Sequence, residues 1–191
     1  MIEKAAIILT NKLSRNNIIE NEARDIYIYG FNLTISTIMN SVLILSLAFL
    51  YRRPLDAMIY ILCTHPLRTN GGGWHAQTHW LCITLGAISF TIVSWACFWI
   101  WASIPWFVLF AVQIISLGII WIRVPVEHPN NPLEDDAKRV MRLKCIVYGG
   151  VIMATSMVLI VMGQQHASVL ITLSATSAVG TFLIPIERST R

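Results

Sequence analysis

Long apolar blocks constrain the fold of this chain more than any other feature of its sequence. Five blocks approach the length of about 20 residues that an α-helix needs to cross the hydrocarbon core of a bilayer. Only 13% of the 191 residues are charged, whereas soluble domains carry about a quarter. The sequence therefore predicts an all-α, polytopic membrane protein. The five blocks are residues 27–50, 80–104, 105–122, 146–162 and 167–186.

A sixth apolar block, residues 55–67, has only 13 residues. It suits a short tilted span, a re-entrant segment or a helix that lines a cavity. If it crosses, the chain has about six transmembrane helices, and only Arg52 and Arg53 lie on one side of the membrane. Basic residues in short loops mark the cytoplasmic side, so this uneven distribution supports the crossing. The other side, predicted to be cytoplasmic, then holds Lys4, Lys12, Arg15, Arg24, Arg68, Arg123, Lys138, Arg139, Arg142, Lys144, Arg188 and Arg191.

The first 25 residues mix charged side chains with an apolar face, which is untypical of a cleaved signal. The apolar residues of this segment recur at helical spacing, and this pattern predicts an amphipathic helix that lies on the membrane surface. An ordinary solvated leader is the alternative. We expect residues 1–191 to form a single membrane domain, with residues 1–25 at the interface and residues 27–191 in a transmembrane bundle. The apolar face is Ile2, Ala5, Ala6, Leu9 and Leu13.

Two larger polar segments, residues 68–79 and 123–144, separate the apolar blocks on the predicted cytoplasmic side. The second contains three prolines, which disfavour helix and predict an extended path. A helix is predicted to begin near Leu133, because acidic residues precede basic ones in the order that suits the helix dipole. A solvated helix end would show the same order of charges. The prolines are Pro125, Pro129 and Pro132, and the acidic residues are Glu134, Asp135 and Asp136.

Reactive side chains are concentrated in residues 68–82, and Cys82 is the strongest nucleophile among them. If Thr78 caps the following helix, Cys82 lies in its first turns, where the positive end of the helix dipole favours a thiolate. The alternative is an apolar cysteine on a span. We expect no disulfide, because the cytoplasm is reducing. Cys63 and Cys97 fall within apolar blocks, where a thiol behaves as a small hydrophobe.

Two imidazoles compete as partners of Cys82. His79 precedes it by three residues and would face it along a continuous helix. His75 precedes it by seven residues, which is about 10 Å along a helix axis. Three consecutive glycines, residues 71–73, allow the chain to fold back and bring His75 close. Sequence spacing alone leaves both partners open.

A cysteine beside a histidine is the minimum for nucleophilic attack on an acyl group, since the imidazole takes the thiol proton and later protonates the leaving amine. Backbone N–H groups of the glycines could stabilise an oxyanion, and Asn70 and Gln77 are alternative donors. Arg68 could bind a substrate carboxylate or anchor the span end among lipid phosphates.

Two other classes of function compete with this interpretation. A zinc site could use His65, His75, His79 and Cys82, but their spacing matches no common zinc motif and no carboxylate is near. A non-enzymatic transporter would be expected to carry polar groups near mid-membrane and often internal repeats, and the sequence clearly shows neither. We therefore expect no metal, no cofactor and no nucleic-acid partner.

The reactive segment resembles the accessory gene regulator protein B (AgrB-like) family. These are membrane cysteine endopeptidases of Gram-positive quorum-sensing systems. The similarity lies in an arginine, then Gly-Gly-x-His-Ala, then a cysteine seven residues after the histidine, and the segment Asn131-Pro132-Leu133 is also similar. The resemblance implies that His75 is the catalytic histidine and Cys82 the nucleophile, with His79 a bystander. It places motif positions on Arg68 and Gly73, and Gly72 and Gln77 are expected to support the site.

The resemblance also implies a substrate and a location. The substrate would be an AgrD-like precursor peptide, whose C-terminal tail is removed at the cytoplasmic face of the cell membrane. A thioester on Cys82 would then allow a side chain of the peptide to close a thiolactone or lactone ring. Basic residues near the site are expected to attract an acidic tail of the peptide; these are Lys138, Arg139 and Arg142. Apolar faces on several spans also suit a homodimer in the lipid bilayer.

Overall fold

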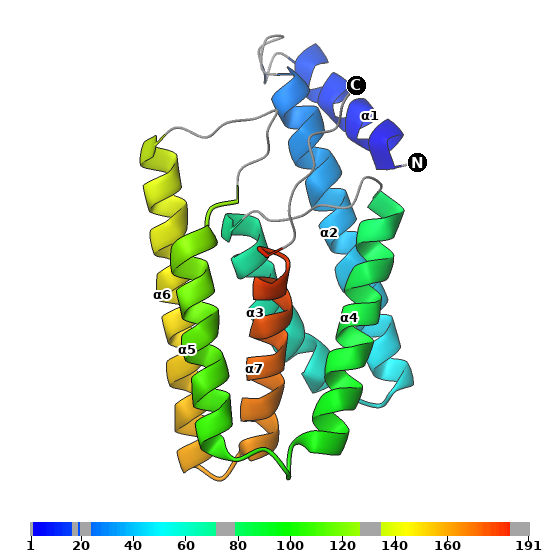
Figure 1. Ribbon diagram of the computed structural model, residues 1–191. Helices are drawn as coiled ribbons and strands as arrows, with labels where there is room; N and C mark the ends of the chain where they lie inside the picture. Colours follow the sequence, from blue (N-terminus) through cyan, green and yellow to red (C-terminus); the bar gives the residue numbers. More distant parts are fainter. Residues whose placement is uncertain (1, 17–18, 20–23, 72–78, 127–134, 184–191) are drawn as a thin grey trace.

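The computed structural model describes residues 2–16, 19, 24–71, 79–126 and 135–183. These residues form a bundle of α-helices, which confirms the predicted all-α class (Figure 1). Helix bounds agree with most of the apolar blocks in the sequence. The helices are α1 (Ile2–Arg15), α2 (Arg24–Leu50), α3 (Pro54–Gly71), α4 (His79–Ile100), α5 (Trp106–Arg123), α6 (Asp135–Val161) and α7 (Gln165–Gly180).

Successive helices from α2 to α7 run in opposite directions (Figure 1). We call the end where α2, α4 and α6 begin the loop end, and the opposite end, where short connections join each of them to the next helix, the hairpin end. The loop end receives the predicted cytoplasmic segments, whereas Arg52 and Arg53 lie at the hairpin end. Four of the described helices, α2, α4, α5 and α6, are long and apolar enough to cross a membrane. The protein is therefore of the multi-pass type, and the number of six crossings stays a prediction.

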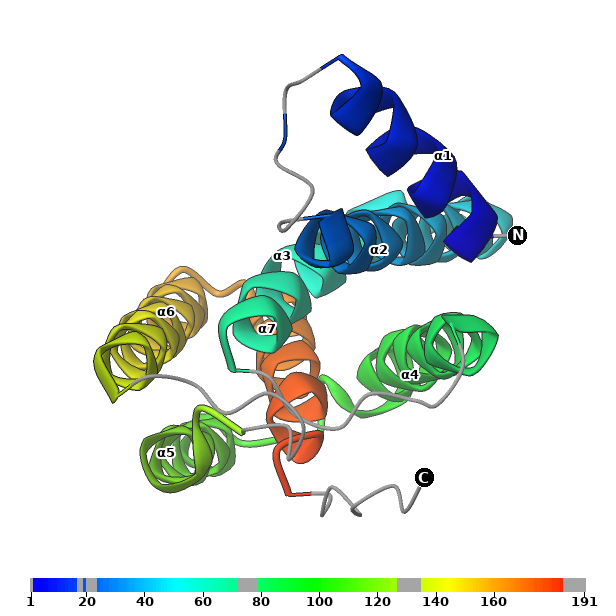
Figure 2. The ribbon, with the colours of Figure 1, turned by 90° about the horizontal axis from the view of Figure 1, so that it is seen from above.

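Helix α7 occupies the centre of the bundle, between α3, α4, α5 and α6 (Figure 2). None of residues 165–179 is exposed, although serine and threonine are frequent among them. Small residues let neighbouring helices approach closely, and their hydroxyls bond across membrane helices. Gln113 of α5 donates to Thr172 at 2.7 Å, and Ser156 of α6 lies 2.6 Å from the hydroxyl of Ser168. Within the block predicted at 167–186, α7 ends at Gly180, and residues 184–186 lie outside the described part of the chain.

Helix α3 is longer than its apolar block predicted. It has 18 residues, so Arg68–Gly71 is a helical turn. The sequence had suggested that a loop starts at Arg68. The polar side chains of this turn bond back to carbonyls of the helix. Thr69 donates to the carbonyl of His65 at 2.7 Å, and the amide of Asn70 donates to that of Pro66 at 2.9 Å.

A proline inside α3 is compensated by a neighbouring helix. Pro66 has no N–H group, so the carbonyl of Leu62 loses its usual donor four residues later. The hydroxyl of Tyr148, on α6, donates to this carbonyl at 2.6 Å. Leu62 lies on the outer surface of the bundle, where lipid supplies no donor to a free carbonyl, so the phenol both satisfies α3 and fixes α6 against it.

Helix α6 is continuous over 27 residues, and it joins the helix start that the sequence predicted near Leu133 to the apolar block at 146–162. Asp135 and Asp136 occupy its first turn, as predicted, while residues 133 and 134 lie outside the described part of the chain. A single helix follows because the basic residues between the acidic turn and the apolar span include no helix breaker. The polar first turns of α6, at the loop end, thus form one continuous helix with the apolar part that follows them.

Helix α1 packs across α2, where Ala6 and Thr10 are fully buried. The guanidinium of Arg24 donates to the side-chain oxygen of Asn11 through Nε at 3.3 Å and Nη2 at 3.0 Å. Ile8 and Leu9 remain 67% and 42% exposed, which leaves an apolar surface on this helix. That surface is consistent with a position at the membrane interface, which stays a prediction.

Candidate functional site

Cys82 lies in the first turn of α4, the helix that follows the reactive segment. Its side chain is partly exposed. Unpaired N–H groups at a helix start create a positive end of the dipole, and this end favours a negative charge. Cys82 is therefore placed at the start of a helix, where its side chain remains accessible to a substrate.

The other three cysteines are enclosed by the bundle. Cys63, Cys97 and Cys145 are 7%, 0% and 1% exposed, and all four cysteines, which the structure describes, are free thiols. The thiol of Cys97 donates to the carbonyl of His166 at 3.5 Å, and that of Cys145 to the carbonyl of Leu67 at 3.8 Å. A peptide substrate cannot reach buried thiols, so among the four cysteines only Cys82 is open to one.

Several predicted site residues fall in the connection between α3 and α4. Gly72, Gly73, His75, Gln77 and the expected cap Thr78 lie outside the described residues. His79 is the first residue of α4, one turn before Cys82, so its backbone position suits the local pairing that the sequence allowed. The choice between the two imidazoles therefore still depends on the family's motif.

The connection starts from a tightly packed junction. Gly71 ends α3, and a side chain added to it would overlap the ring of Phe182, whose Cζ and Cε1 are its nearest neighbours. Phe182 follows α7 and is 1% exposed. The N–H group of Val126, beyond the end of α5, donates to the carbonyl of Gly71 at 2.9 Å. Three separate segments thus fix the point from which the glycine-rich segment leaves α3. No local pattern indicates this contact, because Phe182 and Gly71 are far apart along the chain.

Arg68 lies in the last turn of α3 and is partly buried. A positive charge at this end of a helix interacts favourably with the dipole. Its guanidinium makes no hydrogen bond or ion pair with another described residue. The position suits either predicted role, the binding of a substrate carboxylate or an anchor among lipid phosphates.

The three basic residues expected to attract a peptide tail occupy the first turns of α6. Lys138 forms an ion pair with Asp135 at 3.4 Å. Nε of Arg142 donates to the carbonyl of Val124 at 2.7 Å, which links the start of α6 to the end of α5. Arg139 is exposed. Sequence reasoning missed the structural contact of Arg142, since nothing in the local pattern identifies Val124 as its acceptor.

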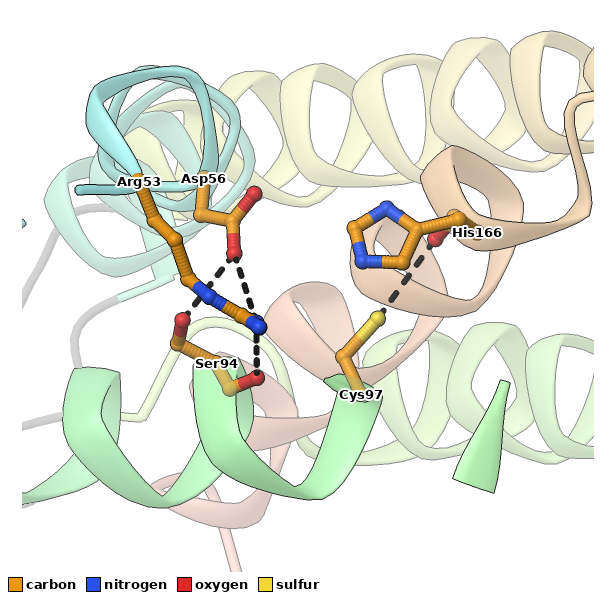
Figure 3. Close-up of polar contacts among 5 residues, drawn as sticks. All are labelled: Arg53, Asp56, Ser94, Cys97 and His166. Atoms are coloured by element: carbon orange, nitrogen blue, oxygen red, sulfur yellow. Dashed lines mark hydrogen bonds and ion pairs between the residues drawn. The ribbon is translucent and has the colours of Figure 1, made fainter. Parts of the chain in front are cut away.

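A second polar cluster lies at the hairpin end (Figure 3). Arg53 and Asp56 form an ion pair at 3.6 Å, and the hydroxyl of Ser94 donates to the same carboxylate oxygen at 3.0 Å. The guanidinium of Arg53 also lies 4.1 Å from the ring centroid of Phe98. The cluster neutralises a basic residue and ties α3 to α4. Its only sequence signal was the i, i+3 spacing of Arg53 and Asp56 at a helix start.

The described residues contain no group of three or more histidine, cysteine or acidic side chains arranged to hold a metal ion. Of the four ligands considered from the sequence, His65 is exposed on α3, and Cys82 lies on α4. His75 is outside the described part of the chain, so the full set is not placed.

Comparisons with known proteins identify the family of this chain. The model of the accessory gene regulator B family matches residues 6–184. AgrB-like protein 2 of Clostridium perfringens (strain 13 / Type A) is 25% identical over 144 residues, which cover 73% of this chain and 67% of the relative. An AgrB-like protein of Clostridium perfringens (strain SM101 / Type A) is 24% identical over the same shares of both chains. No solved structure matches the chain. The chain thus belongs to the accessory gene regulator B family, and this membership implies a part in processing an AgrD-like precursor peptide of agr quorum sensing at a membrane.

Proposed function

We propose that this protein is a membrane cysteine endopeptidase that cuts the C-terminal tail from an AgrD-like precursor through a thioester on Cys82. One observation carries the proposal: Cys82 is the cysteine that combines partial exposure with a place in the first turn of a helix. It also follows directly on the segment that contains His75. A thiolate supported there can attack an acyl group, whereas the three enclosed thiols cannot meet a peptide.

The first step is acyl transfer to sulfur. The imidazole of His75 takes the proton of Cys82, and the thiolate forms a bond to the carbonyl carbon of the scissile peptide. The tetrahedral oxyanion is stabilised by N–H groups of Gly72 and Gly73, with Gln77 as a further donor. The carbon–nitrogen bond then breaks, and the imidazolium protonates the leaving amine of the tail. The products are the free tail and a thioester between Cys82 and the signal portion.

The second step uses the retained reactivity of the thioester. A cysteine or serine side chain of the bound peptide attacks the thioester carbonyl, and the sulfur of Cys82 leaves and regains a proton. The peptide closes a thiolactone or lactone ring without further activation. Water must be excluded from the intermediate, and a site at the membrane edge of a helical bundle is suited to exclude it.

The cytoplasmic position of the site is supported by charge. The described basic residues of the loop end belong to the side that the sequence assigns to the cytoplasm. Arg68, one turn before the end of α3, is near enough in sequence to the reactive segment to bind a carboxylate of the substrate. The location therefore agrees with removal of a tail that has not crossed the membrane.

Reversing the charge of exposed Arg139 to glutamate is expected to slow cleavage of a precursor with an acidic tail about threefold to tenfold at low ionic strength. The effect should fade as salt rises toward about 0.5 M, because screening shortens the range of charges. Initial rates measured against salt concentration check this. Arg142→Lys serves as the comparison, since it keeps the charge while altering the contact with Val124. Equal rates for wild type and Arg139→Glu at low salt would contradict the proposed attraction between Arg139 and an acidic tail of the peptide.

The proposed function is tested with the purified protein in lipid nanodiscs and a synthetic precursor. Mass spectrometry of the rapidly quenched reaction should find the signal portion attached to the peptide that contains Cys82, by a bond that neutral hydroxylamine cleaves. Cys82→Ala should yield neither the adduct nor the free tail, whereas Cys145→Ala should yield both, because that thiol is enclosed. Tail release by Cys82→Ala at the wild-type rate would exclude the mechanism.

A further inference from the structure

One side of helix α2 is apolar and buried near the hairpin end and carries a stripe of polar residues nearer the loop end. Asn32, Ser36 and Asn40 recur at four-residue spacing and therefore lie along one side of the helix. Ile44 and Ala48 continue the same side toward the hairpin end, and they are 1% and 0% exposed. The stripe thus changes from apolar to polar as it approaches the end of the bundle where Cys82 lies.

The two asparagines of this stripe have unmet hydrogen-bonding capacity. The side-chain oxygens of Asn32 and Asn40 are buried and have no hydrogen-bond partner among the described residues. Other polar residues of α2 satisfy themselves locally: Thr34 donates to the carbonyl of Gly30 at 2.9 Å, and Ser46 to that of Val42 at 2.8 Å. Unpaired amide oxygens within a membrane span cost free energy, so they commonly mark a functional surface.

Packing against α4 places the stripe next to the candidate nucleophile. A Cβ atom added to Gly86 would meet the side chain of Asn40, with Oδ1 as its nearest atom, Nδ2 at 2.9 Å and Cγ at 3.0 Å, so α2 approaches α4 closely here. Both helices begin at the loop end and run in the same direction (Figures 1 and 2). Cys82 precedes Gly86 by four residues, as Ser36 precedes Asn40, which is about 6 Å of axis on each helix. The turn of Cys82 is therefore level with the turn of Ser36, between the two asparagines.

We propose that the polar stripe of α2 holds the backbone of the precursor peptide in an extended form beside Cys82. The inference rests on the proposed function and names the part of the protein that positions its substrate. An extended peptide presents N–H and C=O groups that find no water within the membrane. Asn32 and Asn40 are separated by about 12 Å along the helix axis, which corresponds to about four residues of extended chain. Their oxygens accept from peptide N–H groups on either side of the scissile bond.

The stripe is distinguished from a merely structural element by measuring peptide binding, stability and thiol reactivity together. Asn32→Leu and Asn40→Leu keep nearly the same shape and remove the amides. Each is expected to raise KM for the precursor about tenfold with a smaller change in kcat. Thermal stability in nanodiscs should stay equal or rise, because an unpaired polar group is lost. The rate of Cys82 alkylation by iodoacetamide should not change, since this reagent needs no peptide site.

Matched controls come from the same helix. Thr34→Val and Ser46→Ala remove hydroxyls that bond only within α2, so KM should equal that of the wild type. Asn32→Gln retains an amide and should recover part of the lost affinity. If a leucine variant does not accumulate, Asn32→Ser and Asn40→Ser remove the amides while their hydroxyls bond to the helix itself.

Three results would overturn the inference. One is wild-type KM in both asparagine variants, which would leave the thioester mechanism standing. Another is a fall in stability and alkylation rate together with activity, which would make the amides structural. The third is an equal KM for Asn32→Ser and Asn32→Gln, which would show that peptide binding needs no amide at this position. Failure of the proposed function is recognised separately, because wild-type protein would then form no adduct on Cys82.

Discussion

Replacing His75 with alanine is expected to lower kcat/KM for precursor cleavage about a thousandfold, the usual scale for loss of a general base and acid. The same change at His79 should alter kcat/KM less than about threefold. The difference is expected because the family's motif assigns the proton transfers to His75, seven residues before Cys82, and gives His79 no part in them. Single-turnover cleavage of a synthetic precursor measures both.

Damage to the fold is separated from loss of chemistry by two further measurements. Added imidazole should restore part of the activity of His75→Ala but not of Cys82→Ala, because only the first retains a nucleophile. Alkylation of Cys82 by iodoacetamide should slow in His75→Ala, since the thiolate loses its partner. A large loss in His79→Ala with little loss in His75→Ala would reverse the assignment and favour pairing along α4.

Adding a side chain at Gly71 is expected to destabilise the protein and to impair processing together. The new Cβ of Gly71→Ala would overlap the ring of Phe182, with Cε1 at 2.7 Å, so the end of α3 or the turn after α7 must move. Overpacking of this kind costs about 1–3 kcal/mol. The shift also moves the point from which the reactive segment leaves α3, so kcat should fall about tenfold or more. Thermal unfolding in nanodiscs and precursor cleavage check the two effects.

A control and a second substitution make this result specific. Gly118 is also helical, but the position that an added Cβ would take there is open space, so Gly118→Ala should be neutral or stabilise by up to about 1 kcal/mol. Phe182→Leu combined with Gly71→Ala should recover part of the lost stability, because the smaller side chain leaves room. Equal effects of alanine at Gly71 and Gly118 would contradict the proposed junction.

Patterns within the sequence predicted what depends on the local composition of the chain. The apolar blocks predicted the all-α class and most helix positions, since any segment of that length and hydropathy must satisfy its backbone internally as a helix. The sequence also predicted that Cys82 lies near a helix start. It failed at the end of α3, whose last turn is made of polar residues that bond back to the helix. It also failed at the end of α7, which comes before the end of the apolar block.

Contacts between residues distant in sequence decided the features of the fold that local composition did not predict. The sequence alone determined that the chain is a helical membrane protein with one reactive segment, because length, hydropathy and spacing act locally. Only the tertiary structure decided that α7 is central, that Phe182 covers Gly71, and that the amide of Asn40 lies against Gly86 one turn from Cys82. These pairs are brought together by packing of helices distant in sequence, and the shape complementarity that selects them has no period or motif along the chain.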